Sequence, residues 1–341
     1  MRKKKTSTAV DSKHRNKDAC SGFVPKAVPS APVPNLRFAE ILRPGLSAEE
    51  GVSRLLRLYG GMFRAAHKGI LTRNHPDDLH DLRVVMRRFR SALRLYGKRW
   101  PTETASEIEK TIAGFSDTLS PVRDAQVWRQ FLEKPGVRAV ASQDRKWKSY
   151  LRNVGNSTGR RLAELKRIVG GPEWMKFLVT MDRFLRVELP SLEAHPAGES
   201  LEALLSRKVE KVYGLILKHE RNFKEMDPEE FHELRRLVRR GRYWAEFLAP
   251  VAGPAGRRLA VQLKEGADAL GEMHDLDVGQ RILAGSGVSL PRLRRRISSR
   301  RVKCLAAFKK ISKRLWNDGF RKRVMRELRK LQQNPQIGKE A

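Results

Sequence analysis

One stretch of this sequence occurs twice, and that repetition constrains the fold more than any other feature. "LHDLRVVMRRFR" at residues 79–90 aligns without gaps with "FHELRRLVRRGR" at residues 231–242. The aligned basic residues are His80 with His232, Arg83 with Arg235, Arg87 with Arg239, Arg88 with Arg240 and Arg90 with Arg242. A match across so long an interval indicates two copies of one structural unit.

Two further matches keep nearly the same interval. "LSPVRDAQV" pairs with "LGEMHDLDV", and "RLYGGMFR" pairs with "KVYGLILK". The aligned residues are Asp124 with Asp275, Arg57 with Lys211 and Arg64 with Lys218. We therefore predict one repeated domain over residues 46–330, with its copies at residues 46–190 and 198–330.

The apolar residues predict an all-α fold. From Ser47 onward they recur at spacings of three and four, and alternating strand-like runs are absent. Breaks rich in Gly, Pro and Asp separate the helical segments. We predict four helices per copy, which gives two four-helix bundles related by a pseudo-twofold axis. Residues 1–45, rich in Pro, Ser and Lys, are predicted to be a disordered basic arm, and residues 331–341 a flexible tail.

Charge and cysteine content limit the partners and the compartment. The chain has 71 Lys and Arg against 38 Asp and Glu, a formal charge of +33, which favours a polyanionic partner. Nucleic acid, polyphosphate, anionic lipid and acidic protein all qualify. Cys20 and Cys304 form no disulfide or zinc pattern, and no window resembles a signal peptide or a membrane span. We expect a cytoplasmic protein, or one attached peripherally to a charged body.

Helical geometry divides the repeated stretch into two faces. At about 100° per residue, the arginines of the first copy lie within roughly 80° of His80, opposite apolar residues such as Leu82 and Phe89. Like charges at these spacings repel each other, which an ordinary solvated face avoids. Guanidinium groups also grip phosphate oxygens in pairs. The candidate anion-binding residues are His80, Arg83, Arg87, Arg90, Arg94, His232, Arg235, Arg239, Arg242, Arg57, Arg64, Lys211 and Lys218.

The two His-Asp pairs raise the alternative of a metal site for phosphoester cleavage. Neighbouring helical residues point about 100° apart, so His80 and Asp81 cannot easily share one ion, and the nearby arginines would repel it. The same holds for His274 and Asp275. We also find no nucleophile or general base in a recognisable motif. We expect no metal, no cofactor and no catalysis.

The doubled "HxLR" followed by "RRxR", with the doubled "LxxxxDxxV", resembles the CHAD family, the conserved histidine α-helical domain. The resemblance covers about residues 47–330 and implies two four-helix bundles around a basic groove or pore that binds inorganic polyphosphate, with targeting to polyphosphate granules in some members. The residues that carry over are His80, Arg83, Arg87, Arg90, His232, Arg235, Arg239 and Arg242. The two copies differ from each other at Gln126, Gly241 and Arg123.

Several roles within this interpretation stay open. Asp124 and Asp275 are expected either to orient arginines or to form ordinary salt bridges. His80 and His232 are expected either to donate hydrogen bonds as neutral rings or to gain a proton near phosphate, and in the second case binding would tighten as the pH falls through the neutral range. Nucleic acid remains the alternative ligand, although Phe89, Trp244, Phe247 and Trp316 occupy core positions of the predicted helices and not base-stacking positions. The sequence identifies no protein partner and no oligomeric state.

Overall fold

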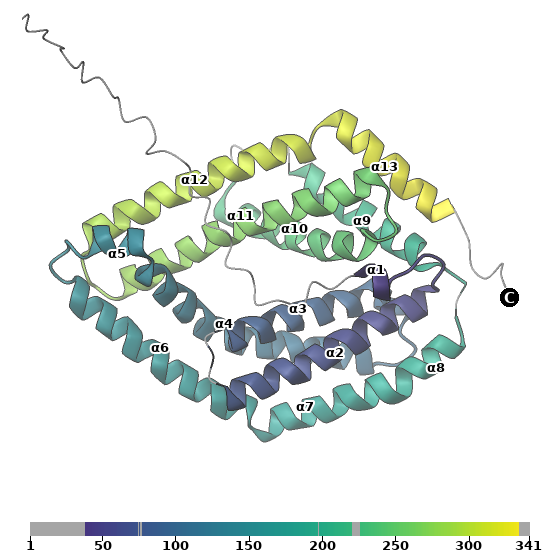
Figure 1. Cartoon of the computed structure of the whole chain (residues 1–341), viewed down its shortest axis with the longest axis horizontal. Coiled ribbons are helices and arrows are strands. Elements are labelled where there is room, and N and C mark those ends of the chain that lie inside the picture. The colour runs from purple at the N-terminus through teal and green to yellow at the C-terminus, as the bar shows by residue number, and fades with distance from the viewer. Residues whose placement is uncertain (1–37, 74, 76, 197, 220–225, 334–341) are drawn as a thin grey trace, which may run out of the picture.

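The computed structural model describes residues 38–73, 75, 77–196, 198–219 and 226–333, and every named element within them is a helix (Figure 1). Residues 1–37 of the predicted arm and residues 334–341 of the predicted tail lie outside the described residues. Residues 38–45 contain the short helix α1 (Phe38–Ile41), and Leu42 is fully buried.

The part of the chain before residue 197 contains more helices than the four that the sequence predicted. Its main helices are α2 (Ala48–Thr72), α3 (Asp78–Tyr96), α4 (Thr104–Glu133) and α6 (Trp147–Val169). It also contains η1 (Gly97–Arg99), α5 (Pro135–Ala141), α7 (Pro172–Arg183), the π-helical segment η2 (Phe184–Glu188) and α8 (Leu189–Ala194). Prolines begin α5 and α7, because proline fits the first turn of a helix and interrupts a preceding one.

The described residues after residue 197 form five helices, one more than the sequence predicted. They are α9 (Leu201–Lys218), α10 (Pro228–Leu248), α11 (Pro254–Gly285), α12 (Pro291–Leu315) and α13 (Asp318–Gln333). Capping boxes start α2 at Ser47 and α10 at Asp227. In each box the side chain accepts a backbone hydrogen bond that the first turn would otherwise lack. These local signals fix where α2 and α10 begin.

Helices from the two parts of the chain pack against each other in matching order. Contacts join α2 with α9, α3 with α10, α4 with α11 and α5 with α12. In Figure 1, α12 and α13 run along one rim and α6, α7 and α8 along the opposite rim, with α2, α3, α9 and α10 between them. The central helices therefore bring together residues that are far apart in the sequence.

A reciprocal pair of backbone hydrogen bonds joins the starts of α2 and α9. The amide of Ala48 donates to the carbonyl of Glu199, and the amide of Leu201 donates to the carbonyl of Leu46, each at 2.9 Å. Ser47 and Ser200, which cap the two helices, lie opposite each other in this joint. The joint aligns the two parts of the chain at their first long helices.

The predicted division of the basic helices into two faces is confirmed on the apolar side. Leu82 and Met86 of α3, and Leu234 and Val238 of α10, are all fully buried. Among the aromatic residues, Phe89, Trp244 and Phe247 are buried as predicted, and Trp316 is partly buried. None of the described helices has the length and apolar composition needed to cross a membrane.

Candidate functional site

The basic faces of α3 and α10 meet in the middle of the molecule, with α4 and α11 beside them. Each of four arginines there lies within electrostatic range of two or more of the others. We call them the central cluster: Arg83 and Arg87 from α3, and Arg235 and Arg239 from α10. The structure thus brings together residues that the sequence alignment had paired across the two copies.

Side chains of other helices hold two of these arginines. The Nε of Arg87 on α3 donates to the hydroxyl of Tyr243 on α10 at 3.3 Å. One terminal nitrogen of Arg83 donates to the Ser116 carbonyl at 3.1 Å and to the Ser120 hydroxyl at 2.9 Å, both on α4. These bonds restrict the guanidinium groups to fixed positions without neutralising their charge.

Arg235 and Arg239 form no hydrogen bond or ion pair with the residues that the structure describes. Burial, followed by repulsion from Arg235 and Arg87, lowers the pKa of Arg239 to about 9. Burial and the nearby Arg87 likewise lower the pKa of Arg83 to about 10. Both side chains remain charged at neutral pH, so the central cluster stores electrostatic repulsion that a bound anion would relieve.

Two carboxylates, Asp124 of α4 and Asp275 of α11, lie beside the central cluster. Asp275 is the main group that opposes the lowering of the Arg235 pKa by burial. The residue Asp275 is exposed at the surface, but the helices around its carboxylate partly desolvate it, which raises its pKa to about 6. The carboxylate of Asp124 also adds to this increase, whereas Arg235 and Arg123 oppose it. Four arginines therefore share two carboxylates, one of which is only partly ionised near pH 6.

His80 contacts the cluster through another arginine. Its Nδ1 lies 3.0 Å from Nη2 of Arg123, and because a guanidinium can only donate, His80 accepts this bond as a neutral ring. Burial and the charges of Arg123 and Arg87 lower its pKa to about 3. The His80 ring is therefore neutral near pH 7 in the unbound protein, and its protonation beside bound phosphate stays a prediction.

His232 lies beside a second histidine, which the sequence alignment had not placed in the site. The ring of His232 on α10 lies 6.1 Å from that of His274 on α11, centroid to centroid. Burial and the nearby Arg235 lower the pKa of His274 to about 4. Burial and the nearby Arg236 and Arg235 also lower the pKa of His232. The histidines of the site are therefore neutral in the unbound protein at physiological pH.

Three of the predicted arginines in the basic faces are paired with acids. Arg94 lies 2.5 Å from Glu109 of α4, and Arg90 lies 3.7 Å from the same carboxylate. Arg242 binds Glu246 at 2.7 Å and Asp268 of α11 at 2.9 Å. Pairing lowers the charge that these residues can offer to a ligand, so the arginines of the central cluster are less neutralised than these flanking arginines.

The predicted residues of α2 and α9 lie apart from this cluster. Arg57 binds Glu193 of α8 at 2.5 Å, and Arg64 forms an ion pair with Asp182 of α7. Lys211 and Lys218 are exposed on α9. The structure therefore joins α3 and α10 in one candidate site and directs the arginines of α2 toward α7 and α8.

Three residues of the site escaped the sequence interpretation. They are Arg123, whose charge acts on Asp124 and Asp275, His274, which lies beside His232, and Arg281, whose charge acts on Asp124. The doubled "[RH]D" motif contained the signal for the first two, because Arg123 precedes Asp124 as His274 precedes Asp275. Arg281 follows His274 by seven residues, a spacing that returns to the same helical face.

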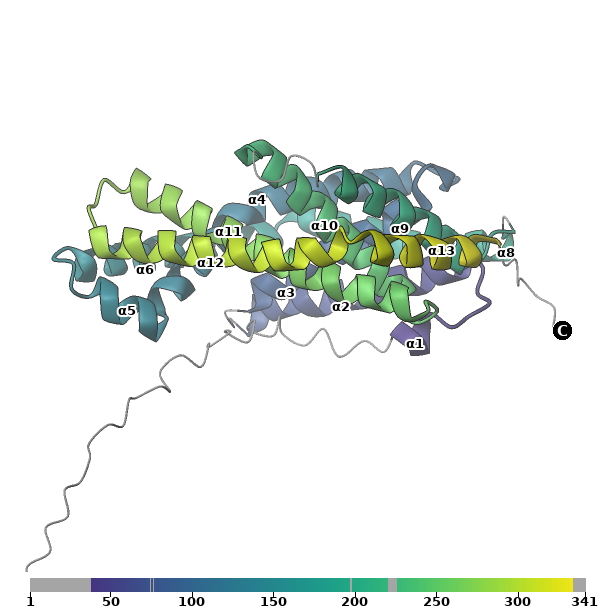
Figure 2. The same ribbon diagram turned by 90° about the horizontal axis from the view of Figure 1, so that it is seen from above.

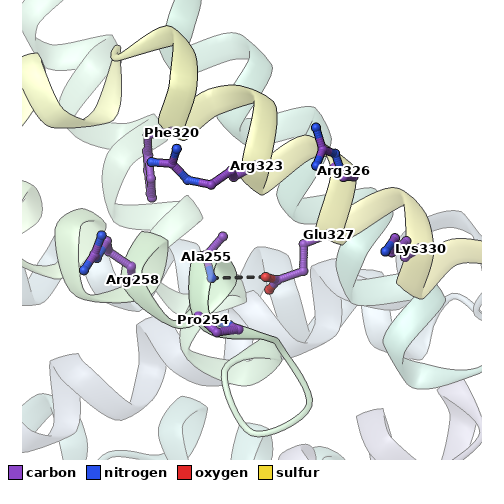
Figure 3. A pocket seen from close by; sticks show the side chains of 8 residues that line it. All are labelled: Pro254, Ala255, Arg258, Phe320, Arg323, Arg326, Glu327 and Lys330. Atoms are coloured by element: carbon purple, nitrogen blue, oxygen red, sulfur yellow. Dashed lines mark hydrogen bonds between the residues drawn. The ribbon is translucent and has the colours of Figure 1, made fainter.

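A cavity of about 420 Å³ lies elsewhere, between the start of α11 and α13 (Figure 3). There the carboxylate of Glu327 accepts hydrogen bonds from the amides of Ala255, at 3.1 Å, and Gly256, at 2.9 Å. Gly253 at the N-cap has no side chain that could accept these hydrogen bonds, so Glu327 of α13 caps α11 instead. None of the residues that line this cavity belongs to the central cluster.

Comparison with known proteins agrees with this architecture. Residues 54–284 match the CHAD domain family, a region that includes all of α3, α4 and α10 and nearly all of α11. The chain belongs to the CHAD family. The resemblance seen in the repeated motifs is thereby confirmed. Among curated proteins, no sequence matches this CHAD protein.

Solved structures with the same fold include two from named organisms. The crystal structure of the CHAD domain from the plant Ricinus communis superposes with a TM-score of 0.61 at 19% identity, covering 82% of this chain and 92% of that one. PptA from Streptomyces chartreusis gives a TM-score of 0.54 at 14% identity and covers 83% of this chain and 99% of that one. At such low identity these likenesses support the CHAD fold and leave the ligand to be argued from the residues of this chain.

Proposed function

We propose that this CHAD protein binds inorganic polyphosphate at the central cluster and does not cleave it. The observation that carries the proposal is the convergence of Arg83, Arg87, Arg235 and Arg239 from both parts of the chain with only two carboxylates beside them. A ligand with closely spaced negative charges relieves this repulsion. Polyphosphate has such charges along its whole length, and guanidinium groups bind phosphate oxygens in pairs.

The arrangement of the helices supports a two-walled site. We propose that the contacts of α2 with α9, α3 with α10 and α4 with α11 reflect two internal repeats related by a pseudo-twofold axis. Each repeat would then contribute one basic wall, α3 or α10, and one acidic residue, Asp124 or Asp275. A linear ligand could contact equivalent groups on both walls, and the walls together would form the basic groove expected for the family.

Two other functions fit the residues less well. Nucleic acid shares the repeated phosphate charge, but Phe89 and Trp244 near the basic faces are buried and unable to stack on bases. For a metal-dependent hydrolase, His80 is already engaged by Arg123 and surrounded by cations that would repel a metal ion. We therefore propose a binding protein without a cofactor. A cytoplasmic location and association with polyphosphate granules belong to the same proposal.

Competition tests the ligand. Labelled long-chain polyphosphate bound to the full chain at about 0.15 M salt should be displaced by unlabelled polyphosphate. Duplex DNA, single-stranded DNA and RNA at equal phosphate concentration should displace much less of it. If nucleic acid displaced the label at a lower phosphate concentration than unlabelled polyphosphate does, nucleic acid would be the ligand of the central cluster.

Incubation of polyphosphate and the full chain with Mg²⁺ or Mn²⁺ should release no phosphate. Steady release of phosphate that His80→Ala abolishes would contradict the non-catalytic assignment.

We predict that the pH dependence of binding comes mainly from Asp275. The pKa of Asp275, already raised to about 6, rises further when a polyanion lies beside it, so the protonated carboxyl binds the ligand more tightly. Affinity should therefore increase as the pH falls from 7.5 to 5, by about tenfold for each unit of additional pKa shift. Asp275→Asn should flatten this profile, as measured by calorimetry at constant ionic strength. A variant with the parent's profile would contradict the assignment.

A further inference from the structure

Helix α12 has a second concentration of positive charge, on the rim of the molecule. Its 25 residues include eleven Lys and Arg and no Asp or Glu. Three of its arginines pair with acids of α11: Arg300 with Glu272 at 2.6 Å, Arg301 with Asp277 at 2.7 Å and Arg314 with Glu265 at 3.5 Å. These pairs anchor α12 to α11 and leave the other cations of the helix unpaired with any described residue.

Five of the cations form a straight line along the helix, which we call the α12 row. The spacings between them are four, seven, seven and four residues, so all five lie within about 40° around the axis and span roughly 33 Å along it. The members of the α12 row are Arg292, Arg296, Lys303, Lys310 and Arg314, and all are exposed. Of the row, only Arg314 forms an ion pair with a described residue.

The α12 row lies apart from the apolar face of the helix. Leu293, Ile297, Cys304 and Phe308 on that face are buried in the core. Like charges four residues apart, as at Arg292 and Arg296 or Lys310 and Arg314, repel each other and destabilise a helix. A face that only needs to be soluble would mix acids with these bases, and α12 contains none.

We propose that the α12 row binds the phosphate backbone of duplex nucleic acid, without regard to base sequence, as a surface separate from the central cluster. A straight row on a rigid helix can contact several phosphates of a stiff duplex at once without ordering the partner. A flexible polyphosphate chain would lose conformational entropy in lying straight along it. The small exposed residues Ser299 and Ala306 beside the row allow a backbone to approach closely.

The side chains of α12 also exclude other modes of recognition. The helix contains no Asn or Gln with which to read base edges, and its one aromatic residue, Phe308, is buried. Insertion of α12 into a lipid surface would require its apolar face, which packs in the core. Contact with phosphates alone is therefore the interaction that the helix offers, and that contact does not depend on sequence.

The position of α12 lets both surfaces act at the same time. Figure 1 shows α12 along the outer edge of the molecule, and Figure 2, seen from above, shows it in front of the other helices, whereas the central cluster lies on α3 and α10. One chain could then hold polyphosphate at its centre and a duplex at its rim. The proposal for α12 does not depend on the identity of the central ligand.

The test uses the full chain and a variant with Arg296→Gln, Lys303→Gln and Lys310→Gln. Its matched control has Lys148→Gln, Arg152→Gln and Arg160→Gln, three exposed bases of α6, so both variants lose the same charge. Binding of two unrelated 25-base-pair duplexes is measured by fluorescence anisotropy at several salt concentrations, with and without saturating long-chain polyphosphate. Circular dichroism melting checks that both variants fold.

The α12 variant should bind both duplexes at least tenfold more weakly than the parent and than the control, while binding polyphosphate as the parent does. A plot of log affinity against log salt concentration should have a slope that is shallower by about 2.7 in the α12 variant, because each of the three lost phosphate contacts contributes roughly 0.9 to the slope. Saturating polyphosphate should leave duplex binding by the parent intact. Equal duplex binding by the two variants would overturn the proposal. So would an equal loss of polyphosphate binding in the α12 variant, which would make the α12 row part of a single polyphosphate site.

Discussion

Replacing Arg87 and Arg239 together with glutamine should weaken binding of long-chain polyphosphate by about a hundredfold or more. A hydrogen bond to a charged group contributes roughly 1.5–3 kcal/mol, and about 2.7 kcal/mol corresponds to a hundredfold change in affinity. Arg87 and Arg239 come from opposite walls of the central cluster and repel each other in the unbound protein. Titration calorimetry or anisotropy at about 0.15 M salt measures the loss.

A control for this variant comes from two arginines that the sequence also nominated. Arg57→Gln with Arg64→Gln removes the same charge, but these residues pair with Glu193 and Asp182 away from the cluster. We expect this control to change affinity by less than about threefold. The cluster variant should also melt no lower than the parent without ligand, since it has less internal repulsion. If the two variants lost the same affinity, net charge and not the central cluster would govern binding.

Replacing Glu246 with glutamine should have the largest effect on stability. Glu246 lies between two largely buried arginines, 3.0 Å from Arg88 and 2.7 Å from Arg242. Arg88 also donates to the buried hydroxyl of Tyr59 at 3.4 Å, so α2, α3 and α10 meet in this network. Removing the partner of a buried charge costs about 3–5 kcal/mol. We expect the melting temperature to fall by roughly 6–10 °C, as measured by calorimetry.

The same change in an exposed pair provides the comparison. Glu133 pairs with Arg129 at 2.9 Å on the surface of α4, where both side chains are nearly half exposed. Glu133→Gln should lower the free energy of unfolding by less than about 1 kcal/mol, because solvent screens such a pair. If Glu246→Gln were no more destabilising than Glu133→Gln, the network of Arg88 would have no structural role.

Local patterns were enough to predict the all-α class and the two faces of α3 and α10, but not the number of helices. Spacing alone separated Leu82 and Met86 from Arg83 and Arg87, and the burial of the first two confirms it. The doubled motifs were enough to identify the family. The first prediction uses residues within two helical turns of each other, and the second uses similarity between two segments. Neither requires knowledge of which helices pack against each other.

The partners of each arginine could not be predicted in this way, because they lie on other helices. Nothing in the spacing of α3 shows that Arg94 meets Glu109 while Arg87 meets Tyr243. The pKa of His80 depends on Arg123, which is 43 positions away. When the two copies are aligned, Glu246 occupies the position that Arg94 has in the first copy. The structure explains this difference, because Glu246 is the counter-charge of Arg88.

The hydrogen bond between Arg87 and Tyr243 joins α3 to α10, so the central cluster can assemble only after both helices have been synthesised. These residues lie 156 positions apart. At about 5–20 residues per second, α10 leaves the ribosome roughly 8–30 s after α3. Until then the nascent chain presents Arg83 and Arg87 without their opposite wall, and the mutual repulsion of the two walls arises only when they dock. Completion of the site is therefore a late event in folding, and a polyanion present at that moment would favour docking.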